Sequence, residues 1–201
     1  MSADVKLFVV DTGPLITLAA AGTLDYLLFS RSGIVLPDAV FYEATFDAAK
    51  LGAQDILDWV KGHRDVVEIA PTHAFTTFEA ARLSLPRLRE ANLGERAAVE
   101  VIEEEGRLSG NACAVLLCEE SAVLKRIVVR DRERIVELST MDFLKILESE
   151  RRIQSADAVF DAASAAGRNA SRSEKMPYPD SEIDEAVHAL LRRDADETAR
   201  G

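Results

Sequence analysis

Hydrophobic residues along this chain alternate between short continuous runs and helical spacing. Runs typical of strands stand at 6–10, 33–36, 66–70, 112–118 and 135–138. The first and fourth have no polar face, which is typical of strands buried on both sides in a parallel sheet. Between the runs, apolar residues recur every three or four positions, as in amphipathic helices. This alternation predicts an α/β fold, a three-layer α/β/α arrangement with a central, mainly parallel sheet.

The helices are predicted from this spacing and from their capping residues. Pro14 suits the first turn of a helix, with Thr12 or Gly13 as N-cap. Ser139 or Thr140 would begin a later helix in the same way. The predicted helices cover residues 15–21, 24–28, 39–44, 54–61, 75–83, 85–90, 96–105, 123–128, 141–148 and 156–166. Pro86 is expected to break the helical pattern of 75–83 and 85–90.

The chain divides into one domain and a tail. Residues 1–167 carry the strand and helix pattern and are expected to form one domain. Residues 168–180 hold serine, basic residues and two prolines with few aliphatic side chains, which indicates a linker. Residues 181–201 are expected to form an amphipathic helix, with Ile183, Val187, Leu190 and Leu191 as its apolar stripe, and a frayed end.

Composition places the chain among folded globular proteins. Hydrophobic residues make up 48% of its 201 positions. No segment reaches the roughly 20 apolar residues of a membrane span, and the charged N-terminus does not resemble a signal peptide. Cys113 and Cys118 are expected to be buried thiols. The chain is therefore predicted to be cytoplasmic.

The net charge of −11 argues against general nucleic-acid binding. Proteins that bind phosphate backbones derive much of their affinity from basic side chains and counterion release. An acidic protein can still act on nucleic acid where its acids gather in a metal site and its bases form a local rim.

Two of the buried runs end in carboxylates. Asp11 follows the first run and Glu119 follows the fourth, with Glu120 next to it. Parallel strands deliver such residues to one edge of the sheet, where ligands bind in open α/β folds. A single acid at that place is often a helix N-cap. Two neighbouring acids repel each other, and a divalent cation removes that repulsion.

Two further acids lie on predicted helices. Glu43 falls among apolar residues, beside Phe41 and Tyr42, whereas most helical glutamates are solvated. Glu95 has a second interpretation, because Asn92 as N-cap would place it at the position of a capping box. A structural alternative, in which all four acids are caps or solvated surface, stays open at this point.

Other chemistries are less compatible with the pattern. The Asp11-Thr12-Gly13 triplet is like that of an aspartic protease, which needs two such loops in a β-rich fold, and the chain has one loop followed by a helix. A phosphatase with a second aspartate two positions on is excluded, because that position is Gly13. The sequence has no glycine-rich phosphate-binding loop.

With these residues in place, the chain resembles the PIN-domain family of metal-dependent ribonucleases, which includes toxins of toxin–antitoxin pairs. Five segments carry the resemblance in the family's order: 9–18 (VVDTGPLITL), 34–43 (IVLPDAVFYE), 93–98 (LGERAA), 114–120 (AVLLCEE) and 138–144 (LSTMDFL). The family's fourth acid is typically aspartate. Here glutamates stand at that place.

The resemblance implies hydrolysis of RNA phosphodiester bonds with Mg²⁺ or Mn²⁺, ions that prefer oxygen ligands. It implies Asp11, Glu43, Glu95 and Glu119 as catalytic acids, with Asp11, Glu95 and Glu119 as metal ligands and Glu120 or Asp131 as alternates for the last. Thr12 and Thr140 would hydrogen-bond the carboxylates, and Arg96 and Arg126 would contact phosphate.

The expected partners follow from the same resemblance. They are an RNA substrate, a protein antitoxin and a second copy of the chain in a homodimer, with no membrane. A catalytically inactive PIN-like module that binds RNA or protein is the alternative function, which the glutamates at the fourth position and the net acidity favour.

Overall fold

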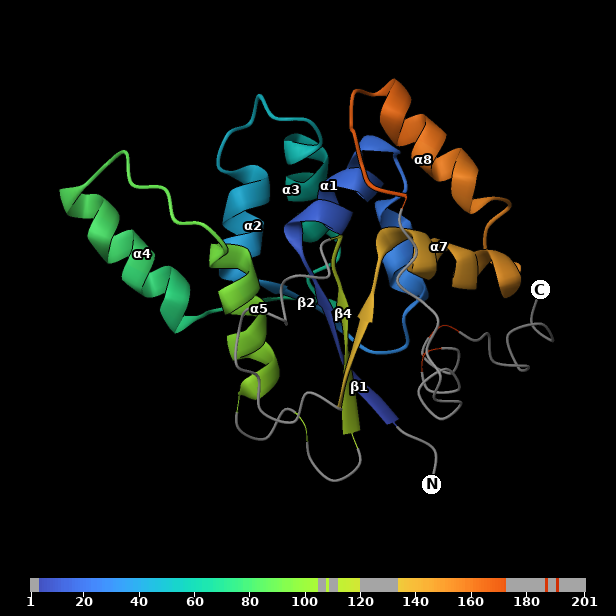
Figure 1. Cartoon of the computed structure of the whole chain (residues 1–201), viewed down its shortest axis with the longest axis horizontal. Coiled ribbons are helices and arrows are strands. Elements are labelled where there is room, and N and C mark those ends of the chain that lie inside the picture. The colour runs from blue at the N-terminus through green and yellow to red at the C-terminus, as the bar shows by residue number, and fades with distance from the viewer. Residues whose placement is uncertain are drawn as a thin grey trace.

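The computed structural model describes residues 4–104, 108, 112–119, 134–172, 187 and 191. Within these residues, five parallel strands form one sheet in the order β3-β2-β1-β4-β5 (Figure 1). The strands are β1 (Asp4–Val10), β2 (Ile34–Pro37), β3 (Val67–Ala70), β4 (Ala112–Leu117) and β5 (Ile135–Leu138). Each lies within one or two residues of its predicted position, and the α/β class is confirmed.

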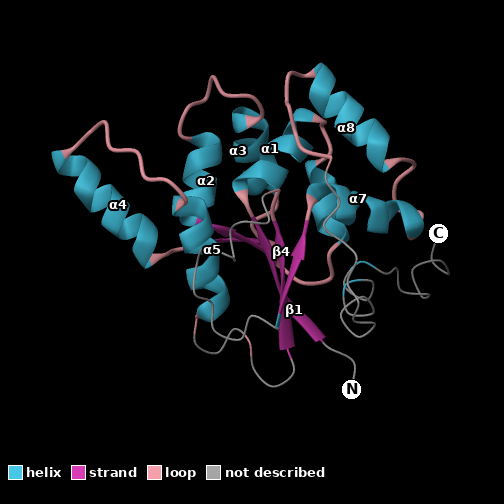
Figure 2. Ribbon diagram, in the orientation of Figure 1, coloured by secondary structure: helices cyan, strands magenta, loops and turns pink. Residues whose placement is uncertain are grey.

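The helices surround this sheet (Figure 2). They are α1 (Thr12–Ala20), the 3-10 helix η1 (Leu24–Phe29), α2 (Asp38–Thr45), α3 (Ala53–Gly62), α4 (His73–Ser84), α5 (Leu93–Glu103), α7 (Thr140–Ser149) and α8 (Ala156–Ala165). None of the helices in the described ranges is both long and apolar enough to cross a bilayer.

Alternate residues of the central strand β1 enter two separate cores. Phe8 and Val10 pack in the larger core with residues of α1, α3, α7 and α8, whereas Leu7 and Val9 pack in a smaller core with α5. Successive strand residues point to opposite faces of a sheet, so a strand covered on both faces needs an unbroken apolar run. Helices on both faces make the three layers predicted from the sequence.

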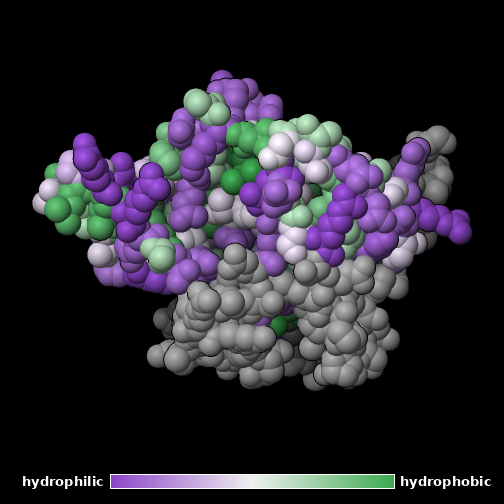
Figure 3. Space-filling view, turned by 45° about the horizontal axis from the view of Figure 1, so that its top comes forward, coloured by the Kyte–Doolittle hydropathy of each residue, from purple (hydrophilic) through white to green (hydrophobic). Residues whose placement is uncertain are grey.

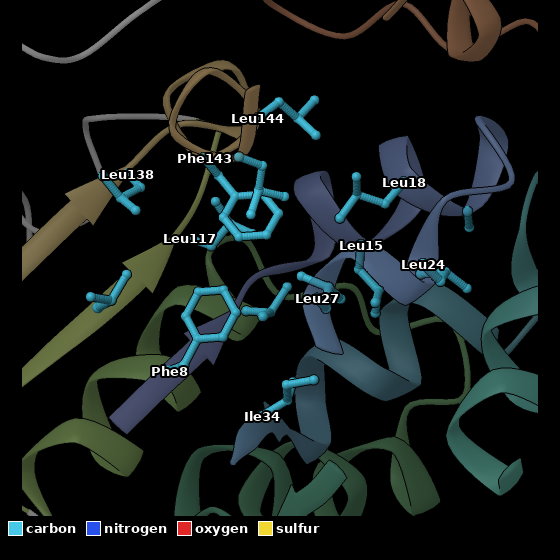
Figure 4. Close-up of a cluster of buried hydrophobic side chains, with 14 of the residues drawn as sticks. Phe8, Leu15, Leu18, Leu24, Leu27, Ile34, Leu117, Leu138, Phe143 and Leu144 are labelled. Carbon is cyan, nitrogen blue, oxygen red and sulfur yellow. The ribbon is translucent and has the colours of Figure 1, made fainter. Parts of the chain in front are cut away.

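The larger core is built around two phenylalanine rings. The rings of Phe8 on β1 and Phe143 on α7 lie 5.8 Å apart between their centroids, with Leu15, Leu117 and Leu144 nearby (Figure 4). Fully burying a side chain of this kind stabilises a fold by ~1.5–3 kcal/mol. The packing of α1 and α7 against β1 and β4 fixes the strand ends at which the acids stand.

Cys113 and Cys118 are buried and form no disulfide, as predicted. Val187 and Leu191, two residues of the predicted C-terminal stripe, are helical and fully buried in the larger core. The rest of 173–201, the predicted helix 123–128 and the greater part of the linker lie outside the described residues.

Three local predictions are wrong: Asp11, rather than Thr12 or Gly13, is the N-cap of α1, and the other two concern the segment before α5. Residues 85–90 are not a helix, because Leu85 precedes Pro86, and the proline ring disfavours helical geometry in the preceding residue. Asn92 precedes α5 in the left-handed region, with φ of 60°, and makes no side-chain capping bond. The predicted capping box with Glu95 is therefore not formed.

Other helix starts agree with the sequence. The Ser139 hydroxyl accepts a hydrogen bond from the backbone N–H of Asp142, and the Asp142 carboxylate accepts one from the backbone N–H of Ser139. Ser155 caps α8, and Gly167 ends the segment after it with φ of 97°. Only glycine adopts that backbone geometry without strain. It directs the next residue, Arg168, back towards α1.

Candidate functional site

Asp11 lies where β1 ends and α1 begins. Its backbone N–H donates to the carbonyl oxygen of Leu117 at 2.9 Å, which ties the end of β1 to the end of β4. The Asp11 side chain makes no capping hydrogen bond to α1. Asp11, rather than Thr12 or Gly13, is nevertheless the N-cap residue of α1, and its carboxylate interacts with the backbone N–H of Thr12 at the edge of the sheet.

Gly94 brings the carboxylates of Asp11 and Glu43 to one place. A Cβ atom at position 94 would lie 3.1 Å from Oε2 of Glu43 and 3.4 Å from Oδ1 of Asp11. Any side chain there would crowd both groups. The glycine at the start of α5 thus lets two carboxylates, one following β1 and one on α2, approach the same backbone.

Glu43 is oriented by a hydrogen bond. The hydroxyl of Thr12 donates to its Oε2 atom at 3.0 Å, as expected for a threonine that positions a carboxylate. The Glu43 side chain is half-buried. Glu43 is thus part of the site rather than a solvated helical residue.

Burial and mutual repulsion change the acidity of Asp11. Loss of water around the carboxyl raises its pKa from 3.8 to about 7. The backbone N–H of Thr12 opposes this shift, while the charges of Glu95, Glu43 and Glu119 add to it. All four predicted acids are therefore close enough to interact electrostatically.

The pKa of Glu43 is also raised, chiefly by burial. The hydroxyl of Thr12 opposes this change, the charge of Glu95 increases it, and the backbone N–H of Gly94 and the charge of Lys50 lower the pKa. Glu95 thus acts on both neighbouring carboxyls from α5, where it is half-buried. The site thus concentrates negative charge around Asp11.

Glu119 differs from the other three because three side chains hold it. Its Oε1 atom accepts hydrogen bonds from the hydroxyls of Thr17 at 2.6 Å and Thr140 at 3.5 Å. Its Oε2 atom is bound by the guanidinium of Arg168 at 2.9 Å. Thr140 therefore contacts a carboxylate as predicted, and Thr17 does so without having been predicted.

Arg168 is the functional candidate that the sequence did not indicate. Its Nη2 atom donates to the Gly13 carbonyl oxygen at 3.4 Å as well as to Glu119, and its Nε donates to Thr17 at 3.2 Å. The contact with Thr17 joins residues 151 positions apart. Nothing in the sequence of the predicted linker indicated a role for Arg168. Thr17 could have been recognised, because it is a polar residue between Ile16 and Leu18 on an apolar helix.

The remaining predicted residues are placed as follows. The Arg96 guanidinium binds the carboxylate of Glu90 on an exposed surface. Glu120, Arg126 and Asp131 lie outside the described residues.

The donor set is suited to a hard divalent cation, since every acid supplies oxygen ligands. In the described ranges, however, no three His, Cys, Asp or Glu side chains are arranged to hold a metal ion as they stand. Glu119 takes its charge compensation from Arg168 instead. Comparison with family models, with curated proteins and with solved structures finds no match.

Proposed function

We propose that this protein is a Mg²⁺- or Mn²⁺-dependent endoribonuclease with its active site at Asp11, Glu43, Glu95 and Glu119. The observation that carries the proposal is the approach of the Asp11 and Glu43 carboxylates to Gly94, at the carboxyl edge of a parallel sheet. RNA as the substrate, and a role as a toxin with an antitoxin partner and a homodimer, come from the resemblance to PIN domains.

The high pKa of Asp11 supports a cation at this place. A carboxylate that is shielded from water and lies near three others is unfavourable when ionised, so the pKa of Asp11 is raised and protonation competes with ionisation near neutral pH. Asp11 would exchange its proton for the cation, with Glu95 and Glu119 as further ligands. Thr12 holds Glu43 in position to orient a water molecule. When bound, a divalent ion supplies Lewis acidity and lowers the pKa of such a water.

The experiment that tests this function is cleavage of labelled RNA, structured and unstructured, in the presence of Mg²⁺ or Mn²⁺. We expect cleavage that a chelator stops and that Asp11→Asn lowers at least 100-fold. Asp65→Asn is a matched control, since Asp65 is an exposed acid in the loop before β3. Cleavage unchanged by Asp11→Asn would refute the mechanism.

A second candidate function is an RNA- or protein-binding module without catalysis. The ion pair between Arg168 and Glu119 favours it, because one of the four acids is already neutralised by the protein itself. This alternative predicts no cleavage of any RNA, together with stabilisation by Mn²⁺ that still depends on Asp11.

A further inference from the structure

A groove begins beside the acidic site and extends along α2 to α4. It has a volume of about 810 Å³ and is lined by residues of α2, of α4 and of the segment that follows α4. Glu43 belongs both to the groove and to the acidic site. Figure 1 shows α4 projecting at the left of the molecule, with the segment after it leading back to α5. We call this hollow the α2–α4 groove.

Aromatic side chains form part of the groove wall. Phe46 is 55% exposed, and its ring stacks on Tyr42 with centroids 5.2 Å apart and planes inclined by 19°. The Lys50 ammonium lies 4.2 Å from the centroid of the Phe46 ring. A ring that is held in place and exposed provides a platform on which a planar group can stack once the flexible Lys50 side chain is displaced from it.

Tyr42 is fixed in turn by Arg82. The Arg82 guanidinium donates to the Tyr42 hydroxyl and lies 5.3 Å from the centroid of the Tyr42 ring. Phe78 packs on the same arginine at 5.6 Å. The aromatic wall is therefore preorganised, and binding a planar ligand there would cost little side-chain entropy.

The groove is basic in an acidic protein. Four cationic side chains line it, Lys50, Arg82, Arg87 and Arg89, against the three carboxylates of Glu43, Asp47 and Glu90. The groove lining therefore carries a net charge of +1, whereas the whole chain carries −11.

Two of these cations are available to a ligand. Arg87 and Arg89 are exposed, and neither forms an ion pair with any residue in the described ranges. Glu90, by contrast, is bound by Arg96.

In Figure 3 the lobe at the left, where Figure 1 places α4, carries hydrophobic and hydrophilic side chains next to one another.

We propose that the α2–α4 groove binds an unpaired nucleotide of an RNA strand, with its base against Phe46 and its phosphates near Arg87 and Arg89. Stacking on an aromatic ring needs a base that is not already stacked in a duplex, and arginines bind the phosphates without regard to sequence. This inference rests on the proposed nuclease function, because continuity with Glu43 would place a neighbouring phosphodiester at the acidic site.

The test is fluorescence anisotropy with a labelled single-stranded RNA of mixed sequence, measured in a chelator so that no hydrolysis occurs. The variants are Arg87→Glu with Arg89→Glu, and Phe46→Leu, which keeps an apolar contact with Tyr42 but removes the ring. The double variant Lys61→Glu with Arg64→Glu is the matched control, because these exposed residues precede β3, at the amino end of that strand, and do not line the groove.

We expect the groove charge reversal to weaken binding at least tenfold and to reduce its salt dependence. We expect Phe46→Leu to weaken binding about tenfold, as is typical for loss of one stacked base, and the control to stay within twofold of the unmodified protein. The same RNA in a duplex should bind at least tenfold more weakly. Circular dichroism and thermal melting confirm that each variant is folded.

The inference is overturned if the groove variants bind single-stranded RNA as the unmodified protein does, or if the duplex binds equally well. It is also overturned if an acidic peptide binds more tightly than RNA with the same dependence on Arg87 and Arg89. Binding lost in the groove variants but kept in Asp11→Asn, with no RNA cleaved, supports the groove and refutes the nuclease. RNA cleavage that the groove variants leave unchanged supports the nuclease and refutes the groove.

Discussion

The guanidinium of Arg168 lies 2.9 Å from the carboxylate of Glu119, although 49 positions separate the two residues in the chain. The side chains are 26% and 14% exposed, so the pair is largely shielded from water. Since the arginine compensates a charge beside Asp11, the segment after α8 is a part of the acidic site rather than a simple connection.

We expect Arg168→Ala to lower the free energy of unfolding by about 1–3 kcal/mol in the absence of metal, because it leaves Glu119 mostly buried without a counter-charge. Denaturant titration followed by circular dichroism measures this. The matched control is Arg172→Ala, whose arginine is 45% exposed and pairs with the exposed Asp161. Its cost should stay below about 1 kcal/mol. Equal losses of unfolding free energy in the two variants would show that the ion pair with Glu119 stabilises the fold no more than an exposed ion pair does.

The raised pKa of Asp11 predicts a stability that falls as pH rises. Between pH 4 and pH 7 the folded protein keeps a proton on Asp11 that the unfolded chain has released, since the pKa is 3.8 in one state and about 7 in the other. The stability that this proton contributes is fully present below pH 4 and lost above pH 7. The difference corresponds to about 4 kcal/mol at most.

Asp11→Asn should therefore be more stable than the unmodified protein at pH 8 and nearly equal to it at pH 4. Thermal melting of both proteins across this range measures the effect, with Asp65→Asn as a control that should show no such trend. A variant that is less stable than the unmodified protein at pH 8 would contradict the burial of an ionised Asp11.

Mn²⁺ should raise the melting temperature by removing repulsion among the acids. An ion at 100 times its dissociation constant stabilises the folded state by about 2.7 kcal/mol, or roughly 5–10 °C for a chain of this size. The shift should be larger at pH 8 than at pH 5.5, where protons compete for Asp11 and Glu43. It should be lost in Asp11→Asn. An equal rise in that variant would mean that the ion binds elsewhere.

Gly94→Ala should weaken Mn²⁺ binding while leaving the stability of the fold nearly unchanged. Alanine favours a helix over glycine by about 0.5–1 kcal/mol, which offsets the contacts that its Cβ would make with Val40 at 3.3 Å and Glu43 at 3.1 Å. We expect the free energy of unfolding to change by less than about 1 kcal/mol. The Mn²⁺-induced shift should fall by more than half.

Gly62→Ala is the matched control for this substitution, because no heavy atom lies within 4 Å of the added Cβ. It should leave the response to Mn²⁺ unchanged. A full Mn²⁺ response in Gly94→Ala would mean that Asp11 and Glu43 do not bind the ion together.

The strands, the three layers and the delivery of Asp11 and Glu119 to strand ends follow from the amino-acid sequence alone. They do so because these features depend on local rules: an unbroken apolar run marks a strand covered on both faces, and an acid after such a run lies at the strand's end. Ser139, one of the two predicted starts of α7, caps that helix for the same reason, since a hydroxyl there meets a backbone N–H three residues on.

How the charges of the acids are compensated, and what surrounds them, depends on tertiary packing. The contacts of Arg168 with Thr17 and Glu119, and the groove between α2 and α4, join segments that are far apart in the chain. No local pattern encodes such distances, because the packing of helices on the sheet sets them. The sequence placed carboxylates at one edge, and the packing determined that Glu119 is bound by an arginine while Asp11 and Glu43 meet at Gly94.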